Sequence, residues 1–240
     1  MFTTEERHWW YRVRREIVLN LLADIRKNLG REISILDVGC GAGGLLKELG
    51  RFGNAYGIDV SEDAVQFGRE HGVQHIQLGS VSAIPYPDNH FDVVCALDVL
   101  EHVQHDHAAV NEIRRVLRPG GRAIVSVPAF PSLWGITDVL SYHYRRYRLR
   151  PLTVLAMNSG FEIIRATYFN TILFIPIALV RLTVRMLGLR VGSENQSFGF
   201  LNELFYRLFH METMFLKYMN LPFGISILMI AQKLQHEENI

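Results

Sequence analysis

Cysteine is scarce in this sequence. Two occur among 240 residues, Cys40 and Cys95, and they form no CxxC pair. A thiolate zinc site or a disulfide framework therefore lacks its ligands and its crosslinks. A strong excess of one charge is also missing, since 25 Lys and Arg stand against 24 Asp and Glu, which argues against a polycationic nucleic-acid binder. With 49% apolar residues the chain can bury a core, and we expect it to be globular.

Long uninterrupted apolar runs are absent as well. The first sixteen residues carry charges throughout, unlike a secretory signal. The most apolar segment, residues 168–189, contains Pro176, Arg181 and Arg185, which disfavours a membrane span. We therefore expect a cytoplasmic protein. The two arginines lie one helical turn apart on an apolar helix, a pattern typical of interfacial helices, so peripheral membrane contact through residues 171–189 is a hypothesis beside plain core packing.

From residue 33 onward, short apolar runs alternate with turns and helical segments. This alternation is typical of a parallel sheet covered on both faces. The pattern predicts an α/β fold: a Rossmann-like, seven-stranded, mostly parallel sheet with helices on both faces and a helical insertion before the last strand. The expected strands are 33–38, 55–59, 75–78, 91–97, 122–128, 160–168 and 225–233.

Two apolar clusters lie outside the expected strands. His8, Trp9, Trp10 and Tyr11 can cover a ligand mouth as a lid, although core packing is the favoured interpretation. In the insertion, apolar side chains recur every three or four positions, which places them on one side of a helix, and we interpret this side as facing the core. A contact with a second copy in a homodimer is the other use of such a stripe. Its members are Leu201, Leu204, Leu208, Met211, Phe215 and Tyr218.

Glycines mark the point where the first expected strand passes into a helix, in the stretch GCGAGG (39–44). Without side chains, a ligand can lie against the backbone, and the free amides of a helix start favour a negative group. Asp59 ends the next strand, where its two carboxylate oxygens can accept from the hydroxyls of a ribose. The pattern indicates a nucleoside cofactor. It does not identify which one, because Gly39, Gly41 and Gly44 also satisfy the dinucleotide motif GxGxxG.

Four stretches appear in a fixed order: LDVGCGAG (36–43), IPYPDNHFDVV (84–94), LDVLEH (97–102) and LRPGG (117–121). In this order and spacing the sequence resembles the class I S-adenosylmethionine-dependent methyltransferases over roughly residues 33–128. The resemblance implies S-adenosylmethionine as cofactor, methyl transfer as the reaction and an antiparallel last strand. We expect four segments: an N-terminal helical lid (1–32), the cofactor-binding α/β core (33–170), a helical insertion (171–220) and the final strand (221–240).

The resemblance also assigns cofactor contacts through the matched motifs. It implies that Asp37, Gly39 and Gly41 surround the methionine part of the cofactor. Asp59 takes the ribose hydroxyls, and Leu97 lines the cofactor beside its reactive sulfonium.

Three further positions surround the expected adenine. The resemblance implies that Val60 flanks the ring and that the backbone amide of Val81 points at it. Ser80 stands where the family commonly has Asp. A serine hydroxyl can still accept a hydrogen bond from the adenine amine, but it lacks the charge and reach of a carboxylate.

Methyl transfer from a sulfonium mainly requires alignment of the partners and exclusion of water. A hydroxyl acceptor also benefits from a nearby base, and His102 after the fourth strand is the first candidate, although a histidine at a helix start can be purely structural. His143 and Asp138 come next, because they follow the fifth strand at the same sheet edge. The arginines and aromatics of residues 141–148 can bind an anionic substrate or pair with acids elsewhere.

Other chemistries find less support. His105 and His107 accompany His102 without an obvious carboxylate in register, so no metal is expected. Cys95 falls in a buried strand, where an attacking thiolate is unfavourable. The Asn-Pro-Pro-aromatic segment of amino-directed nucleic-acid methyltransferases is missing. The predicted acceptor is an unidentified small molecule, and the amphipathic segment 171–189 gives the hypothesis that it is hydrophobic or lipid-linked. The alternatives are an NAD-dependent oxidoreductase and a catalytically silent cofactor-binding protein.

Overall fold

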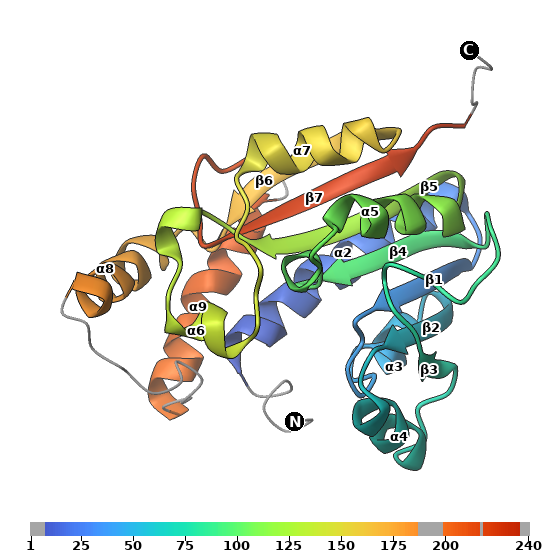
Figure 1. Cartoon of the computed structure of the whole chain (residues 1–240), viewed down its shortest axis with the longest axis horizontal. Coiled ribbons are helices and arrows are strands. Elements are labelled where there is room, and N and C mark those ends of the chain that lie inside the picture. Colours follow the sequence, from blue (N-terminus) through green and yellow to red (C-terminus); the bar gives the residue numbers. More distant parts are fainter. Residues whose placement is uncertain (1–7, 187–198, 217, 236–240) are drawn as a thin grey trace.

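The computed structural model describes residues 8–186, 199–216 and 218–235. In this part of the chain, seven strands form one sheet in the order β3-β2-β1-β4-β5-β7-β6 (Figure 1). The strands are β1 (Ile33–Val38), β2 (Gly53–Asp59), β3 (Ile76–Leu78), β4 (Phe91–Leu97), β5 (Leu117–Pro128), β6 (Phe161–Phe169) and β7 (Ser226–Lys233).

The first five strands run parallel, and β7 pairs antiparallel with both β5 and β6. Every residue of β4 is buried, as expected for a parallel strand covered on both faces. The prediction of a seven-stranded, mostly parallel sheet with an antiparallel last strand is therefore confirmed. Strand β5 begins at Leu117, earlier than the sequence indicated, because Phe91 pairs with Leu117 across an irregular register before Val93 pairs with Arg122.

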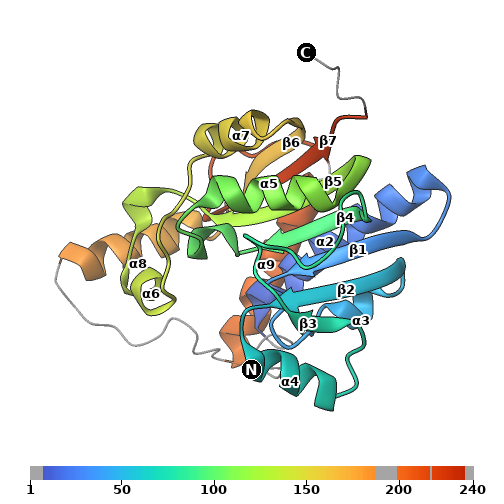
Figure 2. The ribbon, with the colours of Figure 1, turned by 45° about the vertical axis from the view of Figure 1, so that its right-hand side comes forward.

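Helices cover both faces of the sheet (Figures 1 and 2). Helices α5 (Asp106–Val116) and α7 (Leu149–Asn158) bury apolar side chains against one face. On the other face lie α2 (Trp9–Leu29), α3 (Leu46–Leu49), α4 (Glu62–Glu70) and α9 (Gly199–Leu216). The short α6 (Ile136–Leu140), α8 (Phe174–Met186) and the 3-10 turns η1 (Leu100–His102) and η2 (Pro131–Leu133) gather beyond the carboxyl ends of the parallel strands.

Helix α2 packs its aromatic start into the core. The Trp10 ring stacks on Phe169 and Phe209, with centroids 5.5 and 5.6 Å apart, and Trp9 meets Phe209 edge to face at 5.8 Å. Trp9 and Trp10 therefore pack against the core, as the favoured interpretation expected, and His8 and Tyr11 are half-buried. Residues 1–7 of the expected lid lie outside the described residues.

Helix α9 buries a different side from the one that the sequence suggested. Phe209 is fully buried, whereas Leu204, Met211, Phe215 and the following Tyr218 are 40–85% exposed. The core interpretation of the predicted stripe is wrong, and Leu201 has no described side chain. The cause is that α9 is apolar around most of its circumference, so the aromatic rings of α2 and β6 select the side that carries Phe209.

Helix α8 differs from the expected interfacial helix in one respect. The Arg181 guanidinium does not face outward: it donates to the backbone oxygen of Leu133 at 3.0 Å and lies 3.4 Å from the buried carboxylate of Asp138. A buried carboxylate attracts a nearby cation, so Arg181 is engaged with Asp138, and peripheral membrane contact through residues 171–189 stays a prediction. The side chain of Arg185 lies outside the described residues. None of the described helices is long and apolar enough to cross a membrane.

Candidate functional site

The glycine turn lies where the strand order of the sheet reverses, between β1 and its neighbours β2 and β4. Ligands of open α/β sheets bind at this switch point. Gly39 and Gly41 have φ values of +69° and +57°, which favour glycine. A Cβ on Gly39 would lie 2.6 Å from a methyl carbon of Val99, so the turn has no room for a side chain there.

Asp59, at the carboxyl end of β2, holds this turn in place. One carboxylate oxygen accepts from the Gly41 amide at 2.7 Å, and the other accepts from the Ser61 amide at 2.9 Å. Each oxygen keeps a lone pair that can accept from a ligand hydroxyl. Val60, the next residue, is 73% exposed, as a residue that flanks a bound ring should be when the ligand is absent.

The loop after β3 brings Ser80 and Val81 beside Asp59, because the Gly79 amide donates to the Asp59 backbone oxygen at 2.9 Å. The Ser80 hydroxyl oxygen accepts from the Ser82 amide at 3.2 Å, and Val81 is buried.

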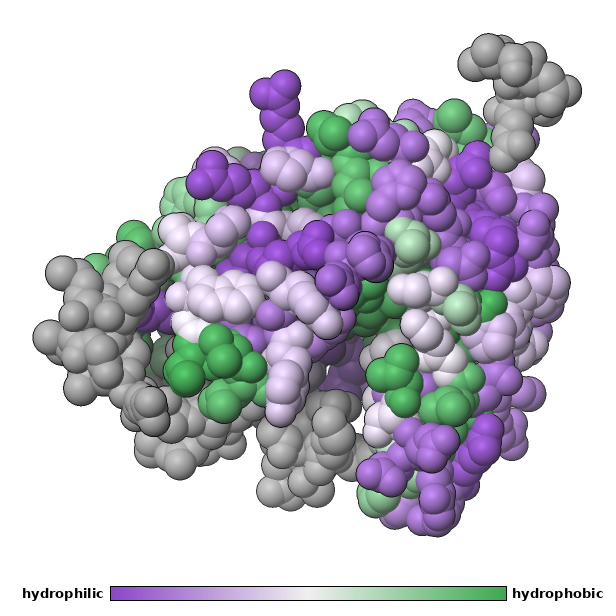
Figure 3. Space-filling view, in the orientation of Figure 1, coloured by the Kyte–Doolittle hydropathy of each residue, from purple (hydrophilic) through white to green (hydrophobic). Residues whose placement is uncertain are grey.

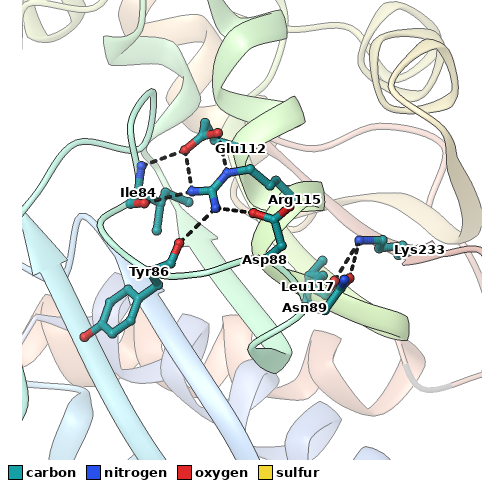
Figure 4. Close-up of polar contacts among 8 residues, drawn as sticks. All are labelled: Ile84, Tyr86, Asp88, Asn89, Glu112, Arg115, Leu117 and Lys233. Carbon is teal, nitrogen blue, oxygen red and sulfur yellow. Dashed lines mark hydrogen bonds and ion pairs between the residues drawn. The ribbon is translucent and has the colours of Figure 1, made fainter.

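Arg115 of α5 fastens the continuation of this loop (Figure 4). Its guanidinium donates to the backbone oxygens of Ile84 and Tyr86 at 2.8 and 2.9 Å and pairs with Asp88 and Glu112. Arg115 thus joins residues 84–88, which follow the expected adenine side of the site, to α5.

Arg14 is a site residue that sequence reasoning missed. From α2 it forms an ion pair with Asp98, the residue after β4, and lies 3.5 Å from the backbone oxygen of Leu97. Burial acts to lower the pKa of Arg14, but the carboxylates of Asp98 and the buried Asp37 outweigh it and raise the pKa. Because some 80 residues separate Arg14 from Asp98, no local pattern could have joined them.

The three predicted catalytic residues lie together at the carboxyl edge of the sheet. They are His102, His143 and Asp138. The two imidazole rings lie edge to face with centroids 4.6 Å apart. The Asp138 carboxylate is fully buried and accepts from His143 Nδ1 at 3.0 Å and from Arg146 Nε at 2.7 Å. Burial acts to raise the pKa of Asp138, but these donors outweigh it and hold the pKa at about 2. Asp138 is therefore a buried anion that orients His143.

Glu101 lies beside this group and was also missed. Its side chain is 1% exposed, and its Oε2 has no hydrogen-bond partner in the described part of the chain. Burial, together with the nearby Asp98, raises the pKa of Glu101 well above its usual range. The sequence signal was present in the LDVLEH stretch, but the burial and the proximity to His143 come only from the fold.

The other residues considered in the sequence analysis lie outside this group of side chains. His105 and His107 are exposed, and the His107 ring contacts Asn111. Arg145 pairs with Asp106 at 2.9 Å, as Arg146 does with Asp138, so these arginines of residues 141–148 serve as partners for acids. Cys95 is fully buried, as predicted, and burial raises its pKa, which disfavours a thiolate.

Comparisons with known proteins agree with this geometry. Residues 36–125 match the family model described as methyltransferase domain. The chain is 30% identical to the ubiquinone/menaquinone biosynthesis C-methyltransferase UbiE of Ectopseudomonas mendocina, over 57% of this chain and 67% of that protein. The chain belongs to the class I S-adenosylmethionine-dependent methyltransferases.

Other proteins named as methyltransferases are also similar to this chain. A demethylmenaquinone methyltransferase of Anoxybacillus flavithermus is 33% identical over 51% of this chain and 55% of its own length. The chain spans 53–61% of the length of three such curated relatives. A solved structure titled as a putative sarcosine dimethylglycine methyltransferase from Galdieria sulphuraria covers 91% of this chain and 86% of its own, at 18% identity and a TM-score of 0.62, and shows the shared fold.

The residues present fit the cofactor of this methyltransferase family, S-adenosylmethionine. The glycine turn has no room for a side chain at Gly39 or Gly43, and the Asp59 oxygens can still accept from hydroxyl donors. Arg14 and Asp37 offer opposite charges where the amino acid end of the cofactor is expected.

Proposed function

We propose that this protein transfers a methyl group from S-adenosylmethionine to an apolar small molecule of the quinol type. The cofactor half of the proposal rests on the position of Asp59. This residue lies at the switch point of the sheet, and its carboxylate accepts a hydrogen bond from the glycine turn. The relatives named for menaquinone and ubiquinone biosynthesis support the acceptor half.

The surface next to the candidate catalytic residues supports an apolar acceptor. Val139 and Leu140 of α6, which directly follow Asp138, are 54% and 59% exposed. Figure 3 shows the resulting hydrophobic patch over α6. On α8, Ile175 and Leu179 are 61% and 60% exposed. Monomeric proteins seldom expose large apolar side chains together without a use for them, which favours an apolar ligand or surface here.

Each part of the site has a role in this reaction. When bound, S-adenosylmethionine would supply a methyl group on a sulfonium sulfur, whose departure as a neutral thioether would balance the new bond to the acceptor. Asp59 and the glycine turn orient the nucleoside, and Arg14 with Asp37 holds the amino acid end. Leu97 excludes water beside the reacting atoms. His102 and His143 contact the acceptor oxygen, and Asp138 positions His143.

Turnover with a labelled methyl group tests the proposal. Purified protein is incubated with methyl-labelled S-adenosylmethionine and a chemically reduced naphthoquinone that carries a short isoprenoid chain. We expect the label in the organic extract. Label that stays on the cofactor, although the protein binds the cofactor, would instead support the catalytically silent alternative.

We also propose peripheral membrane contact through α8 and a homodimer through the exposed side of α9. Because Arg181 is engaged with Asp138, the contact of α8 should depend on apolar side chains more than on charge. Wild-type protein should sediment with neutral and anionic vesicles alike, Leu179→Glu should stay in the supernatant, and Val154→Glu on α7 should behave as wild type. Equal sedimentation of the two variants would refute the assignment to α8.

A further inference from the structure

We propose that Glu101, His102 and His143 form a binding site for one divalent first-row transition cation. One ligand atom from each of these side chains, a carboxylate oxygen and two ring nitrogens, lies within 4.8 Å of the others. Two histidines and one carboxylate are a ligand set that zinc and ferrous iron use in catalytic sites, where positions stay open for a substrate.

The second observation is the state of Glu101. Its carboxylate is buried at 1% exposure, its Oε2 has no hydrogen-bond partner in the described chain, and no ion pair joins it to a described cation. Buried carboxylates are normally paired or bound to metal. The neighbouring acids differ in this respect, because Asp98 pairs with Arg14 and Asp138 pairs with Arg146. Within the described part of the chain, Glu101 is thus the acid of this group without an ion pair, although the charges of Arg14 and Arg146 act on its carboxyl from a distance.

The two histidines are held as metal ligands usually are. His143 points its Nδ1 at the Asp138 carboxylate at 3.0 Å, which leaves Nε2 for an ion. His102 makes a hydrogen bond to the backbone of Ser141, which engages one of its ring nitrogens. Such outer partners fix the orientation of the ring and strengthen the ligand. The sequence offered no carboxylate for His102, His105 and His107; the fold supplies Glu101 and replaces the last two histidines with His143.

The site is open to the surface, and its three ligand atoms lie close to the spacing that a metal ion requires. Burial decreases from Glu101 through His143 to the exposed His102, so an ion can enter from the surface. Ligand atoms around a tetrahedral zinc lie about 3.4 Å apart, given bonds of about 2.1 Å. A small shift of the exposed His102 ring that keeps its hydrogen bond to Ser141 would bring the three ligand atoms to that spacing.

Binding of the cation does not depend on the proposed reaction, but its role does. The open coordination positions would face the acceptor, and an ion there would hold the acceptor oxygen and favour loss of its proton. His102 and His143 then act on the acceptor through the ion.

Cobalt(II) binding to the chelator-treated full chain tests the site, because Co²⁺ absorbs visible light and titrates by calorimetry. We expect one equivalent per chain, with visible bands of a histidine-carboxylate site. Glu101→Gln and His143→Gln should weaken binding at least tenfold, and Asp138→Asn, which removes an outer partner, by about ten- to a hundredfold. His105→Gln, a matched exposed histidine, should change nothing.

Each variant is also titrated with S-adenosylhomocysteine, which should bind as to wild type. This control separates loss of the metal site from loss of the fold or of the cofactor site. No stoichiometric Co²⁺ binding by wild type, or binding that Glu101→Gln and His143→Gln leave intact, overturns the metal site, even if the cofactor still binds.

Discussion

At the residue scale, the sequence was informative where chemistry is local. Asp59 and the glycines Gly39 and Gly41 could be assigned because a strand, a turn and a helix follow one another within some twenty positions. Arg14 and Glu101 could not. The first acts through Asp98, far along the chain, and the second becomes distinctive only because the fold buries it beside His143.

Asp92 gives a pH-dependent prediction at this scale. Burial acts to raise its pKa, but Arg31, the Ser34 amide and Arg118 donate to its carboxylate and lower the pKa from 3.8 to about 2. The charged form is therefore favoured in the fold. Its contribution, about 2 kcal/mol, is present at pH values above 4 and is lost as pH falls from 4 towards 2.

Chemical unfolding between pH 2 and 7 measures this effect. Asp92→Asn should lower the free energy of unfolding at pH 7 by about 1–2 kcal/mol and flatten its decline in acid, because the titrating group is gone. Asp63→Asn, at the exposed start of α4, is the matched control. A decline of unchanged steepness in Asp92→Asn would contradict the account.

At the scale of elements, the seven strands were predicted within a few residues, except for the early start of β5, but the orientation of α9 was not. Its spacing indicated one apolar side, but the buried side is set by Trp9, Trp10 and Phe169, which reach Phe209 from distant parts of the chain. The partner of Arg181 could not be predicted for the same reason, since Asp138 lies on another element.

Two substitutions on α9 test this orientation. Phe209→Ala removes a fully buried ring and should cost about 3–5 kcal/mol of unfolding free energy. Phe215→Ala removes a ring that is 55% exposed and should cost less than about 1 kcal/mol. Equal costs in urea unfolding would mean that the buried side has been misassigned. If this side mediates a homodimer, Phe215→Glu should lower the mass measured by sedimentation equilibrium.

At the scale of the whole molecule, the fold divides the work between two regions at one sheet edge. The cofactor region, from the glycine turn to the loop after β3, was predicted from the sequence because its motifs are contiguous. The proposed acceptor region joins η1, α6 and α8 through contacts between residues far apart in the chain, and Figure 2 shows α6 and α8 side by side. The identity of the acceptor therefore could not be deduced from sequence spacing.

Calorimetric titration of the purified chain with S-adenosylhomocysteine tests the central claim most directly. The account predicts binding of one molecule per chain. It also predicts that Asp59→Asn weakens the affinity at least tenfold while Asp63→Asn does not, because Asp59 is the one of these two residues that we propose to accept from the ribose hydroxyls. Absence of binding to folded wild-type protein, or equal affinities of the two variants, would contradict it.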